Sequence, residues 1–116
     1  MGRDRDSLED ILNSIVLIEQ YVDGVLFDQF ATDLLCQDAV VRRFEIMGEA
    51  AKRVSEDVRN QFPSIPWKAM SRMRDRVIHG YDTIDVKIVW NTIQSELPNL
   101  RNKLQAILNS DALQQN

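Results

Sequence analysis

The chain has 116 residues, of which 44% are hydrophobic and 28% charged, as expected for one domain over residues 1–116 that buries a core without disulfides or metals. Its net charge of −4 excludes a generally basic nucleic-acid-binding protein, and we expect no duplex DNA partner, although a local basic patch is compatible with this charge. A single cysteine, Cys36, and a single histidine, His79, exclude a disulfide framework and a Cys- or His-rich metal site within the chain.

The apolar runs of the sequence are short. None is long enough to cross a membrane, and the first six residues lack the apolar stretch of a signal peptide. We therefore expect a soluble, cytoplasmic protein with no membrane association. Cys36 follows two leucines, which predicts a buried, inert thiol.

The first predicted helix covers residues 4–23, because apolar side chains recur there in steps of three and four. These positions are Leu8, Ile11, Ile15, Ile18 and Val22. Gly24 is a stop signal for the helix. The connector over residues 25–32 contains Phe27 and Phe30, which we expect to reach the core.

The second predicted helix covers residues 33–61. Its apolar seam has heptad-like spacing and consists of Val40, Phe44, Met47, Ala51, Val54 and Val58. The other faces carry charges, among them Arg42, Arg43, Glu45, Glu49, Lys52 and Arg53. Glu45 and Glu49 either line a cleft or bridge helices, and we favour bridging. Gly48 costs a helix about 1 kcal/mol against alanine, which predicts a close helix crossing at this point.

A third helix is predicted from Pro66 to Ile78, with Gly80 as its stop. The final segment begins near residues 82–85 and has an apolar seam from Val86 to Ile107. This seam continues through Pro98, which predicts a kinked helix or two stacked segments.

No strand pattern competes with these helices, and we expect the last residues, 111–116, to fray. The predicted fold is therefore all-α, an antiparallel up-and-down bundle of four to five helices. Because a bundle of 116 residues has little interior, we expect one or two helices to expose apolar surface to a partner chain. The alternative is that one monomer buries both long seams.

The charge is unevenly distributed. Residues 61–81 carry four basic side chains and one acidic one, and no other quarter of the chain is net positive. The basic residues are Lys68, Arg72, Arg74 and Arg76, and the same segment contains His79. A positive site on an acidic body suits a local anionic ligand such as a phosphodiester.

Within this segment, Arg74, His79 and Tyr81 combine three chemistries. An arginine can stabilise negative charge on a phosphorane-like transition state, and a histidine can accept or donate a proton near neutral pH. A tyrosine hydroxyl can bind a phosphate or accept a modifying group. Attack of an RNA 2′-hydroxyl on its neighbouring phosphodiester needs only a base, an acid and stabilisation of the phosphate charge, without a metal or cofactor.

Helical geometry separates the three side chains. On a straight helix Arg74 and Tyr81 share a face, but His79 lies about 140° around from Arg74. Convergence needs unwinding at Gly80 or groups from a second subunit, and a two-fold dimer would bring two His79 side chains to one cleft. The alternative is structural, with His79 at a helix end and the arginines on a solvated face.

The pattern Arg74-x4-His79-x-Tyr81 resembles the R-x4-H-x-Y motif of the HepT-like ribonuclease toxins in the HEPN superfamily. Three more blocks resemble this family in the same order, so that the resemblance covers nearly the whole chain. They are the segment from Arg43 to Lys52, the segment Ile65-Pro66-Trp67-Lys68, and the segment from Asp85 to Pro98.

The resemblance implies a HEPN-like bundle, a homodimer with a composite cleft, and metal-independent cleavage of RNA, with tRNA among the candidate substrates. It also implies the toxin of a type VII-like pair, whose minimal (MntA-type) nucleotidyltransferase antitoxin transfers AMP to the motif tyrosine. On this basis Arg74 and His79 are the catalytic residues, Tyr81 is the modification site, and Asp75, Arg72, Arg76 and Lys68 support RNA binding. Asp75 stands where the family often has asparagine, a change from donor to acceptor that bears on the rate.

Two other hypotheses are open. The chain could be a non-catalytic HEPN module that binds RNA or nucleotides or docks a transferase. It could also be a plain helical interaction protein whose arginines are surface residues. Cleavage by the protein and its loss in a His79→Ala variant discriminate among these hypotheses.

Overall fold

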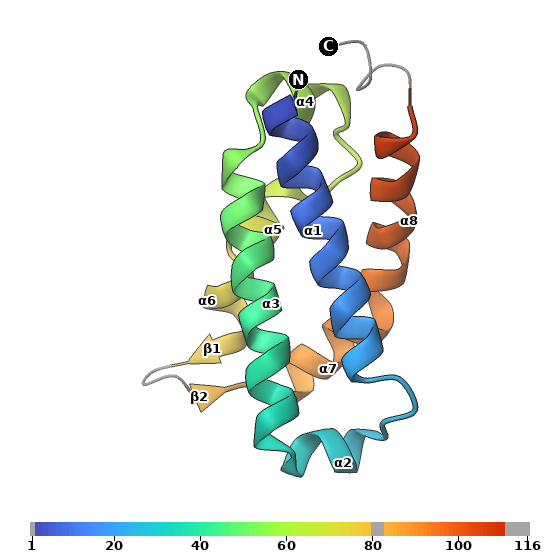
Figure 1. Ribbon diagram of the computed structural model, residues 1–116. Helices are drawn as coiled ribbons and strands as arrows, with labels where there is room; N and C mark the ends of the chain where they lie inside the picture. The colour runs from blue at the N-terminus through green and yellow to red at the C-terminus, as the bar shows by residue number, and fades with distance from the viewer. Residues whose placement is uncertain (1, 80–82, 111–116) are drawn as a thin grey trace.

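The structure, a computed structural model, describes residues 2–79 and 83–110 and forms an all-α bundle, as predicted (Figure 1). Within these residues the chain forms eight helical segments and one small hairpin. They are α1 (Gly2–Tyr21), α2 (Phe27–Thr32), α3 (Leu34–Arg53), α4 (Glu56–Gln61), α5 (Trp67–Ser71), α6 (Met73–Val77), β1 (Ile78–His79), β2 (Thr83–Ile84), α7 (Val86–Ser95) and α8 (Leu97–Leu108).

Helices α1 and α3 are the long antiparallel pair at the centre of the bundle. Helix α8 packs against α1, and α5 and α6 pack against α3 (Figure 1). The predicted apolar positions of α1, from Leu8 to Ile18, are all buried. The Asp33 side chain accepts a hydrogen bond from the Cys36 backbone and caps the start of α3.

The long predicted helix over residues 33–61 is interrupted after Arg53. Val54 takes an extended conformation, and the Ser55 side chain accepts a hydrogen bond from the Val58 backbone to start α4. The buried carboxylate of Asp4, in the first turn of α1, accepts hydrogen bonds from the backbone N and the Oγ of Ser55, both at 2.7 Å. A serine followed by two acidic residues is a helix-start signal, so the break could have been predicted.

The third predicted helix is also interrupted. Arg72 separates α5 from α6, and α6 ends at Val77 rather than at Ile78. The prediction that no strand forms was wrong, because Ile78 pairs with Ile84 and His79 pairs with Thr83 in an antiparallel ladder. The β-branched residues at these positions favour extended backbone.

The final segment agrees with the prediction of two stacked segments. Helices α7 and α8 meet at Glu96, and Pro98 lies in the first turn of α8. Backbone N–H groups in a first turn have no acceptor within the helix, so a proline is tolerated there. The Arg101 side chain of α8 donates to Glu19 of α1 at 2.6 and 2.7 Å. The predicted fraying of residues 111–116 lies outside the described residues.

One chain buries the first long seam completely, whereas Val86 and Trp90 of the second seam are half-buried, and the expectation of apolar surface for a partner chain stays a prediction. Every apolar position of the seam from Val40 to Val58 is buried, and α3, which carries most of them, packs between α1 and the helices α5 and α6. Exposed large apolar side chains occur just before α2 and in the first turn of α3. Leu26, Leu34 and Leu35 are 68%, 72% and 81% exposed.

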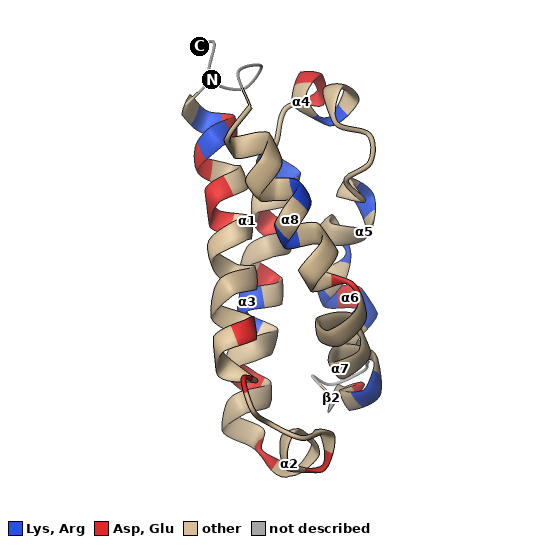
Figure 2. Cartoon of the chain, turned by 90° about the vertical axis from the view of Figure 1, so that its right-hand side faces the viewer, with Lys and Arg blue, Asp and Glu red and all other residues tan. Residues whose placement is uncertain are grey.

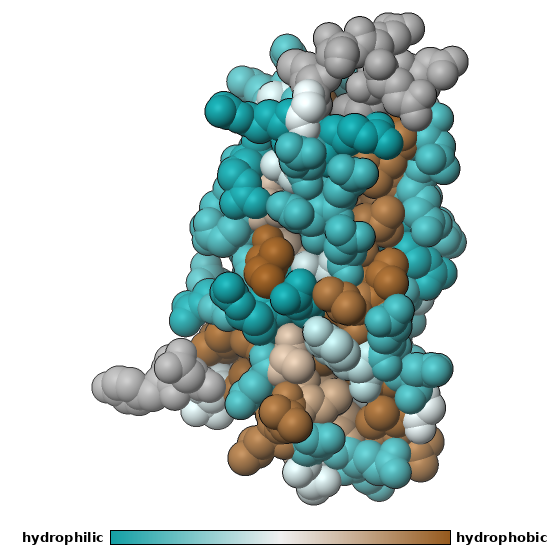
Figure 3. All heavy atoms as spheres, viewed as in Figure 1, coloured by the Kyte–Doolittle hydropathy of each residue, from teal (hydrophilic) through white to brown (hydrophobic). Residues whose placement is uncertain are grey.

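Aromatic packing anchors the connector after α1. Phe30 is buried with its ring centroid 5.3 Å from that of Trp90, as predicted, whereas Phe27 is half-buried at 6.0 Å from the same ring. In the view of Figure 3, hydrophobic residues reach the surface between α1 and α8 and near α2, and mostly hydrophilic residues cover the C-terminal half of α3, at the upper left.

Cys36 is half-buried, not buried as predicted, because it lies in the first turn of α3 beside the end of α1. Its Sγ lies 3.8 Å from the backbone oxygen of Tyr21. Partial burial, and secondarily the charge of Asp33, raises the pKa of this thiol above its ordinary value. A raised pKa leaves less of the reactive thiolate at neutral pH, so we still expect Cys36 to be unreactive.

Candidate active site

The described part of the predicted motif spans a helix and a strand instead of one helix. Arg74 lies in α6, which ends three residues later at Val77, and His79 lies in the strand β1. The backbone is already extended at Ile78, two residues before the unwinding predicted at Gly80. The 140° separation expected on a straight helix therefore does not apply. The His79 side chain and residue Tyr81 lie outside what the structure describes.

The backbone holds β1 and β2 beside the end of α6. The backbone N of Asp85 donates to the oxygen of Val77 at 2.8 Å, and the Asp85 side chain caps α7 by accepting from the backbone of Ile88. The hairpin thus starts and ends on helices that are packed together, and it projects from the side of the bundle (Figure 1).

Arg74 is linked to α3 by an ion pair. Its Nε donates to Oε2 of Glu45 at 3.0 Å, and the two side chains are 53% and 32% exposed. The prediction that Glu45 bridges helices is confirmed by this contact. Glu45 also lines the adjacent cavity, so both of its predicted roles occur together.

The cavity is a groove of about 590 Å³ between α3 and the two short helices α5 and α6. It is lined by Arg42, Glu45, Ile46, Gly48, Glu49, Lys52, Arg53, Ser71, Arg74 and Asp75. Four of these residues are basic and three acidic, so the groove is slightly positive on a protein with a net charge of −4. Such a groove can bind an anion while its carboxylates accept hydrogen bonds from polar groups of the ligand.

Gly48 brings the walls of the groove together. A Cβ at this position would lie 3.2 Å from the backbone oxygen of Met70 in α5, which is tighter than normal contact. The predicted close helix crossing is therefore confirmed. Any larger residue would push α5 away from α3 at the middle of the groove.

The predicted RNA-binding residues do not all lie in this groove. Asp75 lines it beside Arg74, but Lys68 lines a separate depression near Trp67. Arg76 donates from both terminal nitrogens to Glu96, at 3.1 and 2.8 Å, and this hydrogen bonding raises its pKa further. Arg72 is exposed at the junction of α5 and α6 and does not line the groove.

The other basic residues of the groove come from α3. Arg42, Lys52 and Arg53 lie on the polar faces of the predicted second helix, and no function was predicted for them. Together with Glu45 and Glu49 they follow helical steps of three and four, which is the signal that one face of α3 lines the groove. Which face that is depends on where α5 and α6 pack.

Among the described residues, no three His, Cys, Asp or Glu side chains are grouped closely enough to hold a metal ion. None of the helices in the described part of the chain is both long and apolar enough to cross a membrane.

An all-α bundle with a charged groove beside an Arg-x4-His segment defines a protein suited to anionic ligands. Comparison with known families makes the assignment specific. A family model described as "Ribonuclease HepT-like" matches residues 11–107. The chain belongs to the HepT-like ribonuclease family.

Individual relatives agree with the family match. A protein of Thermococcus cleftensis named "Probable ribonuclease HepT" is 41% identical over 103 residues, covering 89% of this chain and 94% of its own length. A relative in Methanocaldococcus jannaschii is 38% identical, covering 90% and 86%, and one in Caldanaerobacter subterraneus is 35% identical, covering 96% and 99%. Both are named "Putative RNase". No solved structure matches the chain.

Proposed function

We propose that this HepT-like ribonuclease is a metal-independent endoribonuclease and the toxin of a type VII-like toxin–antitoxin pair. The observation that carries the proposal is the position of Arg74. Its guanidinium is fixed by Glu45 at the edge of a charged groove, three residues before the helix ends and five before His79. An arginine fixed in this way is suited to stabilising charge on a phosphate that enters the groove.

The proposed reaction is a transesterification. The 2′-hydroxyl of one ribose attacks the adjacent phosphorus, its proton passes to a base, and the O5′ of the next nucleotide leaves after receiving a proton. The products are a 2′,3′-cyclic phosphate and a 5′-hydroxyl. His79 serves as one proton-transfer group, and Arg74 stabilises the negative charge of the pentacoordinate transition state.

A homodimer supplies the second proton-transfer group in this mechanism, because the chain contains a single histidine. Two copies of His79 at one cleft would act as base and acid. The exposed leucines Leu26, Leu34 and Leu35 support a partner chain, since large apolar side chains at this exposure lose contact with water on association. Light scattering after gel filtration should give twice the mass of one chain.

Cleavage of labelled RNA by the His79→Ala variant tests the catalytic assignment. We expect the unaltered protein to cleave in the presence of EDTA and leave a 2′,3′-cyclic phosphate. The variant should lose at least about 100-fold in rate, the usual contribution of a general acid or base. Lys87→Ala, which removes an exposed charge on α7, is the control. Unchanged cleavage by His79→Ala would overturn the assignment.

Regulation by AMP transfer is the second part of the proposal. Co-expression with a minimal nucleotidyltransferase encoded next to this chain should add mass in whole AMP units, and Tyr81→Phe should prevent the addition. Modification of Tyr81→Phe at another residue would contradict the choice of Tyr81.

A non-catalytic HEPN module, which binds RNA or nucleotides or docks a transferase, is the second candidate. The ion pair between Arg74 and Glu45 favours it, because that carboxylate competes with an incoming phosphate for the same guanidinium. RNA that is bound yet stays intact at high protein excess would support this candidate over the endoribonuclease.

A further inference from the structure

The groove extends well beyond Arg74 along α3. Arg42 and Arg74 flank Glu45 near one end, and Lys52 and Arg53 lie two helical turns further along α3. Seven residues of α-helix separate Glu45 from Lys52, a distance of about 11 Å along the axis. The groove therefore has two basic ends, with Glu45 and Glu49 along the wall between them.

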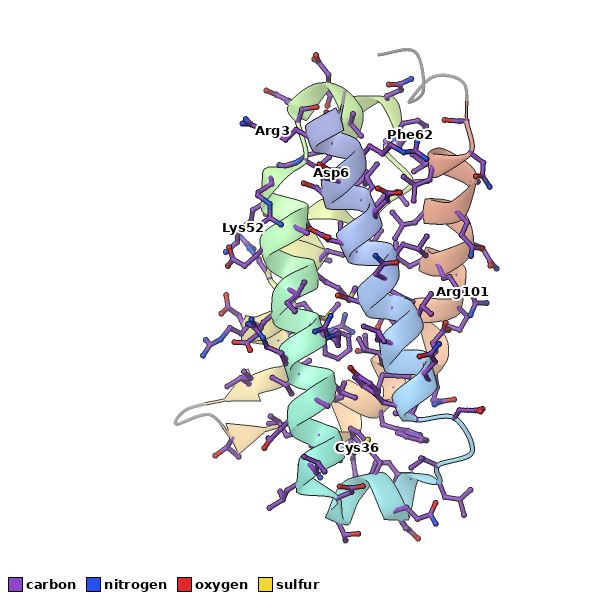
Figure 4. All side chains as sticks on the ribbon, viewed as in Figure 1. Arg3, Asp6, Cys36, Lys52, Phe62 and Arg101 are labelled. Carbon is purple, nitrogen blue, oxygen red and sulfur yellow. The ribbon has the colours of Figure 1, made fainter. Side chains whose placement is uncertain are left out.

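Lys52 and Arg53 contribute little to the stability of the fold. Their side chains are 58% and 53% exposed, and their ion pairs with Glu49 and Asp10 are long, at 3.4 and 3.5 Å. Exposed pairs of this kind contribute little to stability. Figure 4 shows Lys52 on the outer side of α3, directed away from α1.

The end of α3 does not need these two cations either. A basic side chain in the last turn often caps the helix carbonyls, but Arg59 of α4 already does so. It donates to the backbone oxygens of Ala51 and Lys52 at 3.2 and 3.1 Å. Lys52 and Arg53 are thus positioned to bind a ligand.

The charge distribution identifies the chemistry of that ligand. Residues 6–41 contain eight acidic side chains and no lysine or arginine, and Figure 2 shows this acidic surface on α1 and α2. A polyanion is repelled there and attracted to the groove. Arg74 beside Glu45 and Lys52 about 11 Å further along α3 fit a chain of phosphates better than one phosphate. The carboxylates between them can accept hydrogen bonds from 2′-hydroxyl or base N–H groups.

We infer that the groove binds single-stranded RNA along α3, with backbone phosphates at Lys52 and Arg53 as well as at Arg74. This rests on the proposed function, and it assigns the substrate's distal contacts to α3 rather than to Lys68, Arg72 and Arg76. A groove of about 590 Å³ accommodates a segment of one strand.

Salt dependence of binding provides the test. A fluorescein-labelled oligouridylate of about 12 nucleotides is titrated at several salt concentrations against the His79→Ala protein, which leaves the RNA uncleaved. Each phosphate contact on a single strand contributes about 0.7 to the slope of log affinity against log salt. Adding Lys52→Ala and Arg53→Ala should therefore reduce the slope by about 1.4.

The control adds Arg3→Ala and Lys87→Ala, which remove the same charge at exposed positions outside the groove and should leave the slope unchanged. Equal slopes for the protein with Lys52→Ala and Arg53→Ala and for the control with Arg3→Ala and Lys87→Ala would overturn the inference. Failure of the His79→Ala protein to bind the RNA would overturn it as well. A change of oligomeric mass at unchanged slope would assign the groove to a protein partner. If the slope falls as expected but the unaltered protein cleaves no RNA, only the proposed function fails.

Discussion

The buried carboxylate of Asp4 ties the start of α1 to the junction of α3 and α4, and its removal should destabilise the protein strongly. Asp4 is 3% exposed and accepts two hydrogen bonds of 2.7 Å from Ser55, one from the backbone N and one from Oγ. The perturbation is Asp4→Ala, which leaves both Ser55 donors without this acceptor. Asp4→Asn keeps one side-chain oxygen in place.

The magnitude follows from the two contacts. A hydrogen bond with one charged partner contributes about 1.5–3 kcal/mol, and Ser55 is only partly buried, so we take the lower value for each. Asp4→Ala should then reduce the free energy of unfolding by about 3 kcal/mol, and Asp4→Asn by about half as much. For a domain of this size, 3 kcal/mol corresponds to a fall in Tm of roughly 12 °C.

Urea denaturation followed by circular dichroism measures these changes. Asp6→Ala is the matched control, because Asp6 is an exposed aspartate on the same helix and should change stability by less than about 0.5 kcal/mol. A double-mutant cycle with Ser55→Ala should give a coupling energy of at least about 1 kcal/mol. A loss for Asp4→Ala no larger than that of Asp6→Ala would refute the reasoning.

Two further predictions concern Gly48 and Cys36. Gly48→Ala should not yield the gain of about 1 kcal/mol expected in an open helix, and Gly48→Leu should cost about 1–3 kcal/mol in urea denaturation, because the Met70 oxygen is too close. A full gain for Gly48→Ala would contradict the close approach. Because burial raises the pKa of the Cys36 thiol, its contribution to stability is present below the ordinary thiol pKa of about 8.5 and is lost as the pH rises through the higher folded value. Stability above that pH should therefore fall more in the unaltered protein than in Cys36→Ser, and identical pH profiles would exclude this effect.

Several features of the fold could be predicted because they depend on local spacing. The buried faces of α1 and α3 follow from apolar steps of three and four, and the crossing at Gly48 follows from a costly glycine inside a helix. Two of the features that prediction missed, the break before α4 and the strand pair, had local signals as well. Ser55 with two acids after it starts a helix, and β-branched residues stand at Ile78, Thr83 and Ile84 in the two strands.

The candidate site was only partly predictable. Arg74 and Asp75 could be found from a short segment, because their neighbours along the chain carry the motif. The partners of Arg74 and Arg76 could not, since Glu45 lies 29 residues before Arg74 and Glu96 lies 20 residues after Arg76. Both ion pairs depend on how the helices pack. From the sequence alone, many other acidic residues were equally plausible partners for these arginines.

The sequence by itself determined the helical class, the buried faces of the long helices, the Arg-x4-His motif and the membership of the HepT-like ribonuclease family. Local periodicity and residue chemistry suffice for these, because they depend on neighbours within one or two turns. Only the tertiary structure decided that Arg74 faces α3 and that Lys52 and Arg53 share its groove. The physical reason is that a groove belongs to two elements at once, and its charge is set by which faces their packing leaves exposed.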